Sequence, residues 1–124
     1  MDPVLNTGRF VYVTLSDPSL IPREEIIASI REPEGLSVIV SSETAQRRGI
    51  EGTFPCAWIT LTTHSDLAAV GFTSVFATAL GNAGISCNVV AGTNHDHVFV
   101  PHHLAEKALT VLRELQRDGT TTYR

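Results

Sequence analysis

The sequence predicts an α+β protein made of two successive units, in each of which helices pack on one face of a sheet. Two observations predict this fold class. Segments with strand-like alternation and segments with helical periodicity follow one another as strand, helix, strand, strand, helix. A set of matches then relates the first part of the chain to the later part. This order is that of the ferredoxin-like βαββαβ unit, and the first of the two units lacks its first helix.

In the first unit, alternating apolar residues predict strands and a capping pattern predicts one short helix. The strands are Arg9–Leu15, Ile26–Arg31 and Leu36–Ser41. The last two flank the turn signal Pro33-Glu34-Gly35 and are expected to form a hairpin. The short helix starts at Ser41-Ser42 and ends at Gly49. Between the first strand and the hairpin, the segment SDPSLIPREE carries two prolines and is predicted to be a loop.

The second unit has the complete set of elements. Its strands are predicted at Ala57–Thr62, Ile85–Ala91 and His97–Val100. The clearest helix spans residues 72–83, where apolar side chains recur every three or four residues before Gly84. A last helix runs from about His102 to Gln116, and basic residues lie at its C-terminal end, where the helix dipole favours cations.

An internal repeat links the two units. LSVIVSSETAQRR and HVFVPHHLAEKA align at a constant offset of 60 residues, which pairs Val38 with Val98 and Val40 with Val100. Thr14-Leu15 aligns with Thr60-Leu61 at an offset of 46. Because the offsets differ by about one helix with its turns, the first unit is expected to lack a helix. We expect residues 1–54 to form this degenerate unit and residues 55–124 to form the complete one.

Composition limits the classes of function. The chain has 124 residues, 43% hydrophobic and 18% charged, which is typical of a globular domain. Nine Lys and Arg against 13 Asp and Glu give a net charge of −4, which argues against binding nucleic acid or an anionic membrane. The N-terminal residues do not resemble a signal peptide, and no apolar run approaches the ~20 residues of a membrane span. A cytoplasmic protein is expected.

Catalytic signatures are missing from the sequence. It contains no G-x-S-x-G, H-E-x-x-H, phosphate-binding or dinucleotide-binding motif. The two cysteines, Cys56 and Cys87, lie in apolar surroundings, where a buried and unreactive thiol is expected. A thiolate pair of Cys87 with His97 is the weaker alternative. We therefore expect a protein that is not an enzyme and needs no cofactor.

Three stretches of the second unit are more specific: THSDLAAVGFTSVFATALGNAGISCNVVAG, then TNHDHVFVP, and the amphipathic helix after them. Together they resemble ACT domains, small regulatory modules that bind amino acids. The sequence is most similar to small tandem-ACT proteins related to the ACT repeats of cytosolic arginine sensors. The resemblance is strong over residues 64–115 and weaker over residues 9–49.

The resemblance implies a ligand site formed by two segments, the loop Thr63–Phe72 and the hairpin Asn88–His97. The residues expected there are Ser65, Asp66, Val70, Gly71, Phe72, Asn88, Gly92, Thr93 and Asp96. Gly71 would let a carboxylate approach N–H groups at a helix start, and Asp96 would bind an α-ammonium group. Where the sensors carry a further acidic residue, this sequence has Ala68-Ala69, which argues against arginine as the ligand.

For each of these residues a structural role is the alternative. Ser65 and Asp66 are suited to capping a helix, and Gly71 to a turn. Asp96 is suited to stabilising the hairpin turn, and Asn88 to bonding neighbouring backbone.

Two other functions compete with amino-acid binding. His95 and His97, with His64, have a spacing that could chelate a metal, although His102 and His103 fall at a helix start and no acidic outer-shell partner is evident. No physiological metal site is expected. The second face of the sheet carries aromatic and threonine side chains, namely Tyr12, Thr14, Trp58, Thr60, Thr62 and Phe99. Such a face suits an assembly module.

The preferred function is a sensor that binds an amino acid or related small metabolite. It is expected to form a homodimer and to report ligand occupancy to a regulated protein partner.

Overall fold

A computed structural model describes residues 2–62, 67–68 and 70–118. The chain divides into two compact units, Gly8–Cys56 and a unit that joins Met1–Thr7 to Ala57–Arg124. We call them the N-terminal and the C-terminal unit. The expected boundary between residues 54 and 55 placed the whole N-terminus in the first unit, whereas the first seven residues cluster with the C-terminal part of the chain. Within the described ranges, no helix is long and apolar enough to cross a membrane.

The N-terminal unit is built on an antiparallel sheet with the strand order β3-β4-β2-β5. Its strands are β2 (Phe10–Leu15), β3 (Ala28–Glu32), β4 (Gly35–Ser41) and the first residues of β5 (Thr53–Leu61). Gly35 closes the β3–β4 turn at φ 142°, and a β-carbon there would lie 2.5 Å from the carbonyl oxygen of Leu15. Glycine is therefore required at this turn.

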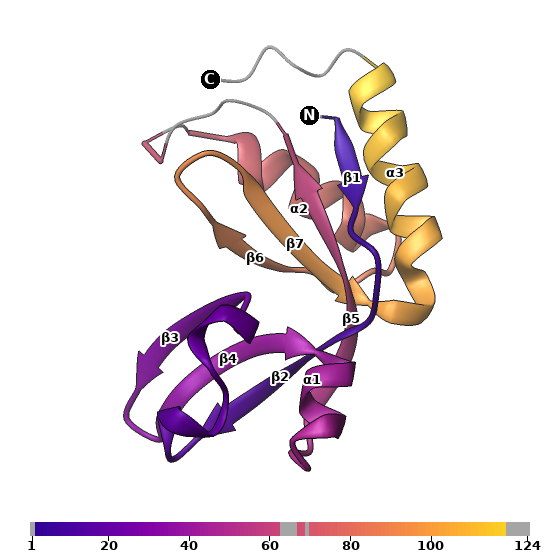
Figure 1. Ribbon diagram of the computed structural model, residues 1–124. Helices are drawn as coiled ribbons and strands as arrows, with labels where there is room; N and C mark the ends of the chain where they lie inside the picture. The colour runs from indigo at the N-terminus through magenta and orange to yellow at the C-terminus, as the bar shows by residue number, and fades with distance from the viewer. Residues whose placement is uncertain (1, 63–66, 69, 119–124) are drawn as a thin grey trace. The chain divides into compact units, whose positions relative to one another are not determined.

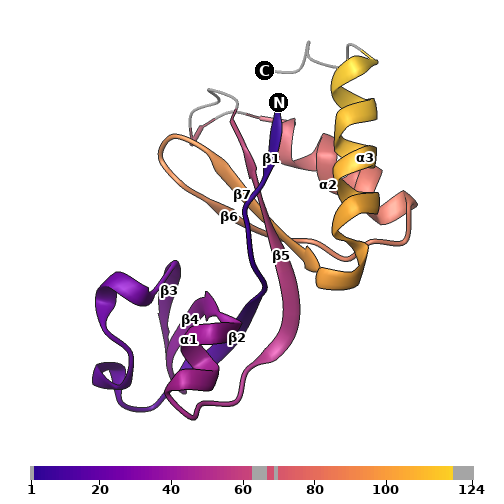
Figure 2. The same ribbon diagram turned by 45° about the vertical axis from the view of Figure 1, so that its right-hand side comes forward.

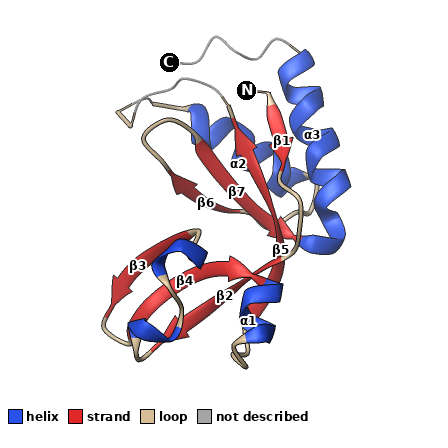
Figure 3. Ribbon diagram, in the orientation of Figure 1, coloured by secondary structure: helices blue, strands red, loops and turns tan. Residues whose placement is uncertain are grey.

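The predicted absence of the first helix is confirmed (Figure 3). The segment between β2 and β3 forms two short 3₁₀ turns, η1 (Pro18–Leu20) and η2 (Arg23–Glu25). The one α-helix of this unit, α1 (Ser42–Arg47), begins at Ser41, whose hydroxyl accepts a hydrogen bond from the Thr44 N–H at 3.0 Å. Seven buried apolar side chains of the unit form its core cluster: Val11, Val13, Leu15, Ile21, Val38, Val40 and Ala45.

The C-terminal unit has the complete set of elements. Strand β7 (Asp96–Pro101) lies between β5 and β6 (Asn88–Ala91), and β1 (Pro3–Leu5) pairs with β5 on its other side. Helices α2 (Phe72–Asn82) and α3 (Ala105–Arg117) cover one face of this sheet (Figures 1 and 2). The largest fully buried side chains here come from both layers: Phe76, Leu80, Leu112, Ile59, Leu61 and Val98.

Three predicted element starts were wrong by three or four residues. Strand β6 begins at Asn88 because the N–H of Ile85 donates to the Leu80 carbonyl at 3.0 Å and so completes the end of α2. Strand β5 begins at Thr53, four residues early, because residues 53–56 pair with β2. Helix α3 begins at Ala105, since the 3₁₀ turn η3 (His102–Leu104) precedes it. Strand β1 was not predicted.

Candidate functional site

The predicted ligand residues fall into two groups in the C-terminal unit. One group lies at the start of α2, and the other belongs to the β6–β7 hairpin. The C-terminal end of β5, from which the chain leads to α2, is at the same end of the sheet as the hairpin turn (Figures 1 and 2). Ser65 and Asp66, two members of the first group, lie outside the described residues.

The first group is centred on Gly71, which precedes α2 with φ 96° and ψ −22°. This left-handed conformation is strained for any residue with a β-carbon. Gly71 has no side chain with which to cap the helix, and the first N–H groups of any α-helix have no carbonyl partner within the helix itself. Val70 is 75% exposed, whereas Phe72 is buried and belongs to the core. Phe72 was predicted to contact the ligand, but its side chain packs in the core.

The second group lies on a tight hairpin. Ala91 pairs with Asp96, and the N–H of Gly92 donates to the His95 carbonyl at 2.8 Å. A β-carbon on Gly92 would lie 3.1 Å from that same oxygen, so the turn leaves little room for a side chain. Asn88 and Thr93 are exposed.

Asp96 is half-buried, and this burial raises the pKa of its carboxyl, while nearby His97 lowers it. Among the described residues it forms no ion pair. A carboxylate that is partly removed from water and has no cationic partner favours binding a cation. The hairpin thus presents one negative group at the edge of a turn.

A polar network that sequence reasoning missed lies beside the hairpin. The Trp58 indole N–H donates to Nδ1 of His97 at 3.0 Å, and the Thr60 hydroxyl lies 3.3 Å from the same atom. The side-chain amide of Asn6 donates to the Thr60 hydroxyl at 2.9 Å and to the Trp58 carbonyl at 3.1 Å. The Trp58 ring also stacks on Phe99, with centroids 6.1 Å apart.

This network fixes the state of His97. An indole nitrogen can only donate, so Nδ1 of His97 is the acceptor and the neutral ring carries its proton on Nε2. Burial and the neighbouring His95 lower the pKa of His97, and Asp96 raises it. A β-carbon on Gly92 would lie 3.4 Å from Nε2, which places the ring against the hairpin turn. The signal in the sequence was the shared face of Trp58, Thr60 and Phe99, but the pairing with His97 depends on strand register.

The histidine spacing does not produce a metal cluster within the described residues. His95 lies in the turn before β7, and its buried Nδ1 has no hydrogen-bond partner. Nδ1 of His97 is occupied by Trp58. His102 and His103 follow β7, at the end of the strand away from the hairpin. His64 lies outside the described residues.

Both cysteines lie in surroundings that disfavour a thiolate. Burial raises the pKa of Cys56 to about 11, and its thiol lies 3.4 Å from the Phe10 carbonyl. Burial also raises the pKa of Cys87. A nucleophilic cysteine needs the opposite shift, so neither environment is suited to thiol catalysis.

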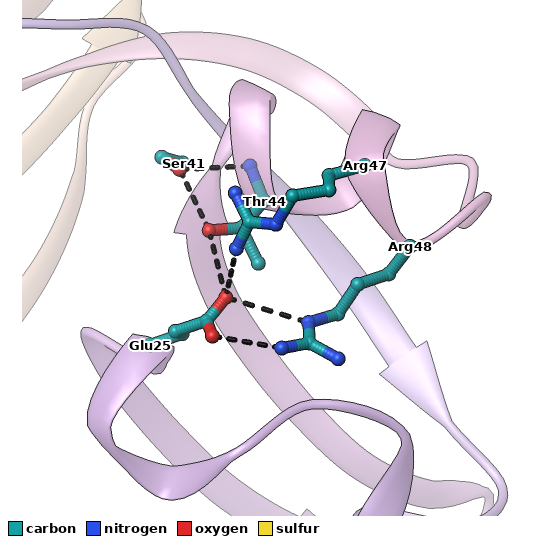
Figure 4. Close-up of polar contacts among 5 residues, drawn as sticks. All are labelled: Glu25, Ser41, Thr44, Arg47 and Arg48. Carbon is teal, nitrogen blue, oxygen red and sulfur yellow. Dashed lines mark hydrogen bonds and ion pairs between the residues drawn. The ribbon is translucent and has the colours of Figure 1, made fainter.

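In the N-terminal unit, the most connected polar cluster is centred on Glu25 (Figure 4). Its carboxylate accepts hydrogen bonds from the guanidinium groups of Arg47 and Arg48 and, at 3.3 Å, from the Thr44 hydroxyl. The hydrogen bond from Arg48 is the main cause that lowers the pKa of Glu25. The cluster fastens the turn η2 to α1.

Matches to known proteins extend over nearly the whole chain. Two family models described as ACT domains match in tandem, one at residues 1–57 and the other at residues 53–114. A Vibrio cholerae protein of unknown function, described as a possible transport protein, is 45% identical, with a TM-score of 0.80 over 89% of this chain and 85% of that one.

More distant solved structures share the fold. Aspartokinase alpha and beta subunits superpose with a TM-score of 0.69 at 14% identity, over 94% of this chain and 98% of that one. The regulatory subunit of aspartate kinase from Thermus flavus gives a TM-score of 0.66 at 13% identity, over 92% and 96%. A search of curated proteins found no match.

Proposed function

Because the chain belongs to the ACT domain family, with two such domains in tandem, we propose that it is a regulatory module that binds an amino acid or a related small metabolite. It catalyses no reaction in this proposal. ACT domains as a family are regulatory, and the raised pKa of both thiols and the absence of catalytic motifs in the sequence agree with that role.

The observation that carries the proposal is the position of Asp96. Its partly desolvated carboxylate lies at the end of the sheet where the chain leads to the start of α2. An amino acid has the two complementary charges. Its ammonium group would bind Asp96 by a charge-assisted hydrogen bond, and its carboxylate would bind N–H groups beyond Gly71.

A regulatory output requires that the ligand bind two states with different affinity. We propose that the protein forms a homodimer and that ligand binding shifts its packing or its contact with a regulated protein. Sedimentation velocity with and without ligand measures the first part of this proposal. A monomer under both conditions would contradict it.

Thermal denaturation against the twenty amino acids tests the ligand. A ligand at ~100 times its Kd stabilises by about 2.7 kcal/mol, which corresponds to a shift in Tm of several degrees. We expect one amino acid or a small group to give this shift, and Asp96→Asn to abolish it.

Asp118→Asn, at the exposed end of α3, is the matched control and should keep the shift. Zinc and EDTA are run in parallel, since a shift with zinc alone would favour the metal alternative. A shift that survives in Asp96→Asn would overturn the proposed site.

A further inference from the structure

The N-terminal unit contains a cavity where its missing helix leaves the sheet incompletely covered. On this sheet Val13 pairs with Val38, and Leu15 pairs with Leu36, so these apolar side chains share one face. In the C-terminal unit α2 covers the corresponding face with Phe72, Phe76 and Leu80. Here the loop between β2 and β3 places only Ile21 fully in the core.

The resulting cavity has a volume of about 490 Å³. The cavity is open to solvent, and its two polar lining residues, Arg23 and Ser29, are exposed; the six apolar ones are Pro18, Ile21, Ile26, Ile27, Ala28 and Leu36. This volume lies within the range of small-molecule sites, in which a few polar groups are set among apolar side chains.

The walls of the cavity are fastened by hydrogen bonds that need no ligand. Asp17 accepts hydrogen bonds from the N–H and the hydroxyl of Ser19, which holds η1. Glu25 anchors η2 to α1 through Arg47 and Arg48 (Figure 4). The N–H of Ile27 donates to the Ile39 carbonyl at 2.9 Å and holds the far end of the loop on the sheet. A preformed cavity lowers the ordering cost of binding.

Arg23 is the one charged residue among the described residues that line the cavity. Arg23 forms no ion pair within the described part of the chain, in contrast to Arg47 and Arg48. Of its two acidic neighbours, Glu25 pairs with Arg47 and Arg48 at α1. Arg31 adds a second guanidinium on the same face, since it pairs with Leu36 in the sheet.

We propose that this cavity binds a small aliphatic carboxylate, whose hydrocarbon part packs on Ile21, Ile26 and Leu36 and whose carboxylate pairs with Arg23. A guanidinium is the side chain best suited to a carboxylate, because its planar fork can donate two parallel hydrogen bonds. The Ser29 hydroxyl supplies a further donor. This site lies wholly in the N-terminal unit and does not depend on the amino-acid site proposed for the C-terminal unit.

A methyl NMR titration of the full chain with 4-methylpentanoate tests the site. We expect saturable shifts of the methyl groups of Ile21, Ile26 and Leu36. Arg23→Met should weaken binding at least tenfold, whereas Arg113→Met, on α3 of the other unit, should leave it unchanged. The neutral analogue 4-methylpentanamide should bind as weakly to the wild type as the carboxylate binds to Arg23→Met.

Ser29→Phe provides a second test, since it fills the cavity from the edge strand β3 without removing a charge, and Ser29→Thr is its conservative control. If Ser29→Phe loses binding but keeps the Tm of the wild type, and Ser29→Thr still binds, the site is supported. Equal affinity in Arg23→Met and wild type, or shifts confined to the C-terminal unit, would overturn it. Asp96→Asn should leave this titration unchanged, so failure here and failure of the amino-acid site are separate results.

Discussion

Replacing Trp58 with phenylalanine should destabilise the C-terminal unit by about 1–2 kcal/mol and raise the pKa of His97. The variant removes the indole N–H that donates to Nδ1 of His97 at 3.0 Å. A neutral hydrogen bond contributes about 0.5–1.5 kcal/mol net. The smaller ring also loses part of the stacking on Phe99, which for an aromatic pair is worth about 0.5–1.5 kcal/mol in full.

The pKa of His97 gives the more specific readout. In the wild type, burial holds this pKa below the ordinary value of 6.5. The unfolded chain therefore binds the proton at a higher pH than the folded chain, so stability is lost as pH falls from about 6.5 through the folded pKa. A donor on Nδ1 favours the neutral ring. Without it the pKa should move up toward 6.5, and the loss of stability in acid should become smaller.

Urea unfolding followed by circular dichroism measures the stability, and NMR titration of the imidazole protons measures the pKa. Asn6→Ala is the matched control, because it removes two hydrogen bonds of the same network and leaves the Trp58–His97 bond intact. It should lower stability without moving the pKa of His97. If the pKa stayed constant or fell in Trp58→Phe, the assignment of Nδ1 as the acceptor would be refuted.

Two further predictions concern backbone strain and acid sensitivity. Gly71→Ala should destabilise the protein by about 1 kcal/mol, because residue 71 has φ 96°. Gly81→Ala should stabilise it by about 0.5–1 kcal/mol, because Gly81 lies inside α2 and nothing lies within 4 Å of the added carbon. If thermal denaturation showed that Tm shifts in the same direction in both variants, this prediction would be contradicted. The hydrogen bond from Arg48 lowers the pKa of Glu25 from 4.5, so its contribution to stability is present above pH 4.5 and lost as pH falls through the folded pKa. Glu25→Gln should therefore lower the stability of the N-terminal unit at neutral pH. Hydrogen exchange should also show a smaller loss of stability in acid than in the wild type. If the pH dependence of stability were unchanged, this ion-pair cluster would contribute nothing to it.

Local periodicity was sufficient to predict most of the fold. Helix α2 begins at Phe72 as expected, because Phe72, Phe76 and Leu80 recur at the interval that buries one stripe of a helix. The missing helix of the first unit was predicted from the two offsets of the repeat, and two 3₁₀ turns occupy its place. The period of the helix and the offsets of the repeat are both properties of the linear sequence, which is why they could be recognised without a structure.

Features that depend on distant pairing could not be predicted. Strand β1 has three residues, and it is a strand only because it pairs with β5 more than 50 residues away. The apolar run from Ile85 to Ala91 predicts one strand. In the structure the N–H of Ile85 caps the end of α2, and no local sequence pattern distinguishes this capping segment from the strand that follows. The role of His97 likewise follows from the positions of Trp58 and Thr60 on a neighbouring strand.

The two units cover their sheets in different ways, and this difference accounts for the different positions of the two proposed sites. Where α2 is present, its side chains fill the sheet face, and the proposed ligand residues Gly71 and Asp96 lie at the end of the sheet. Where the helix is missing, the loop buries Ile21 and is held at its rim by the ion pairs of Glu25. Rim contacts of this kind fix the walls without filling the space between them. A ligand in the cavity would then supply the apolar contacts that a helix supplies in the other unit, so occupancy should stabilise the N-terminal unit itself.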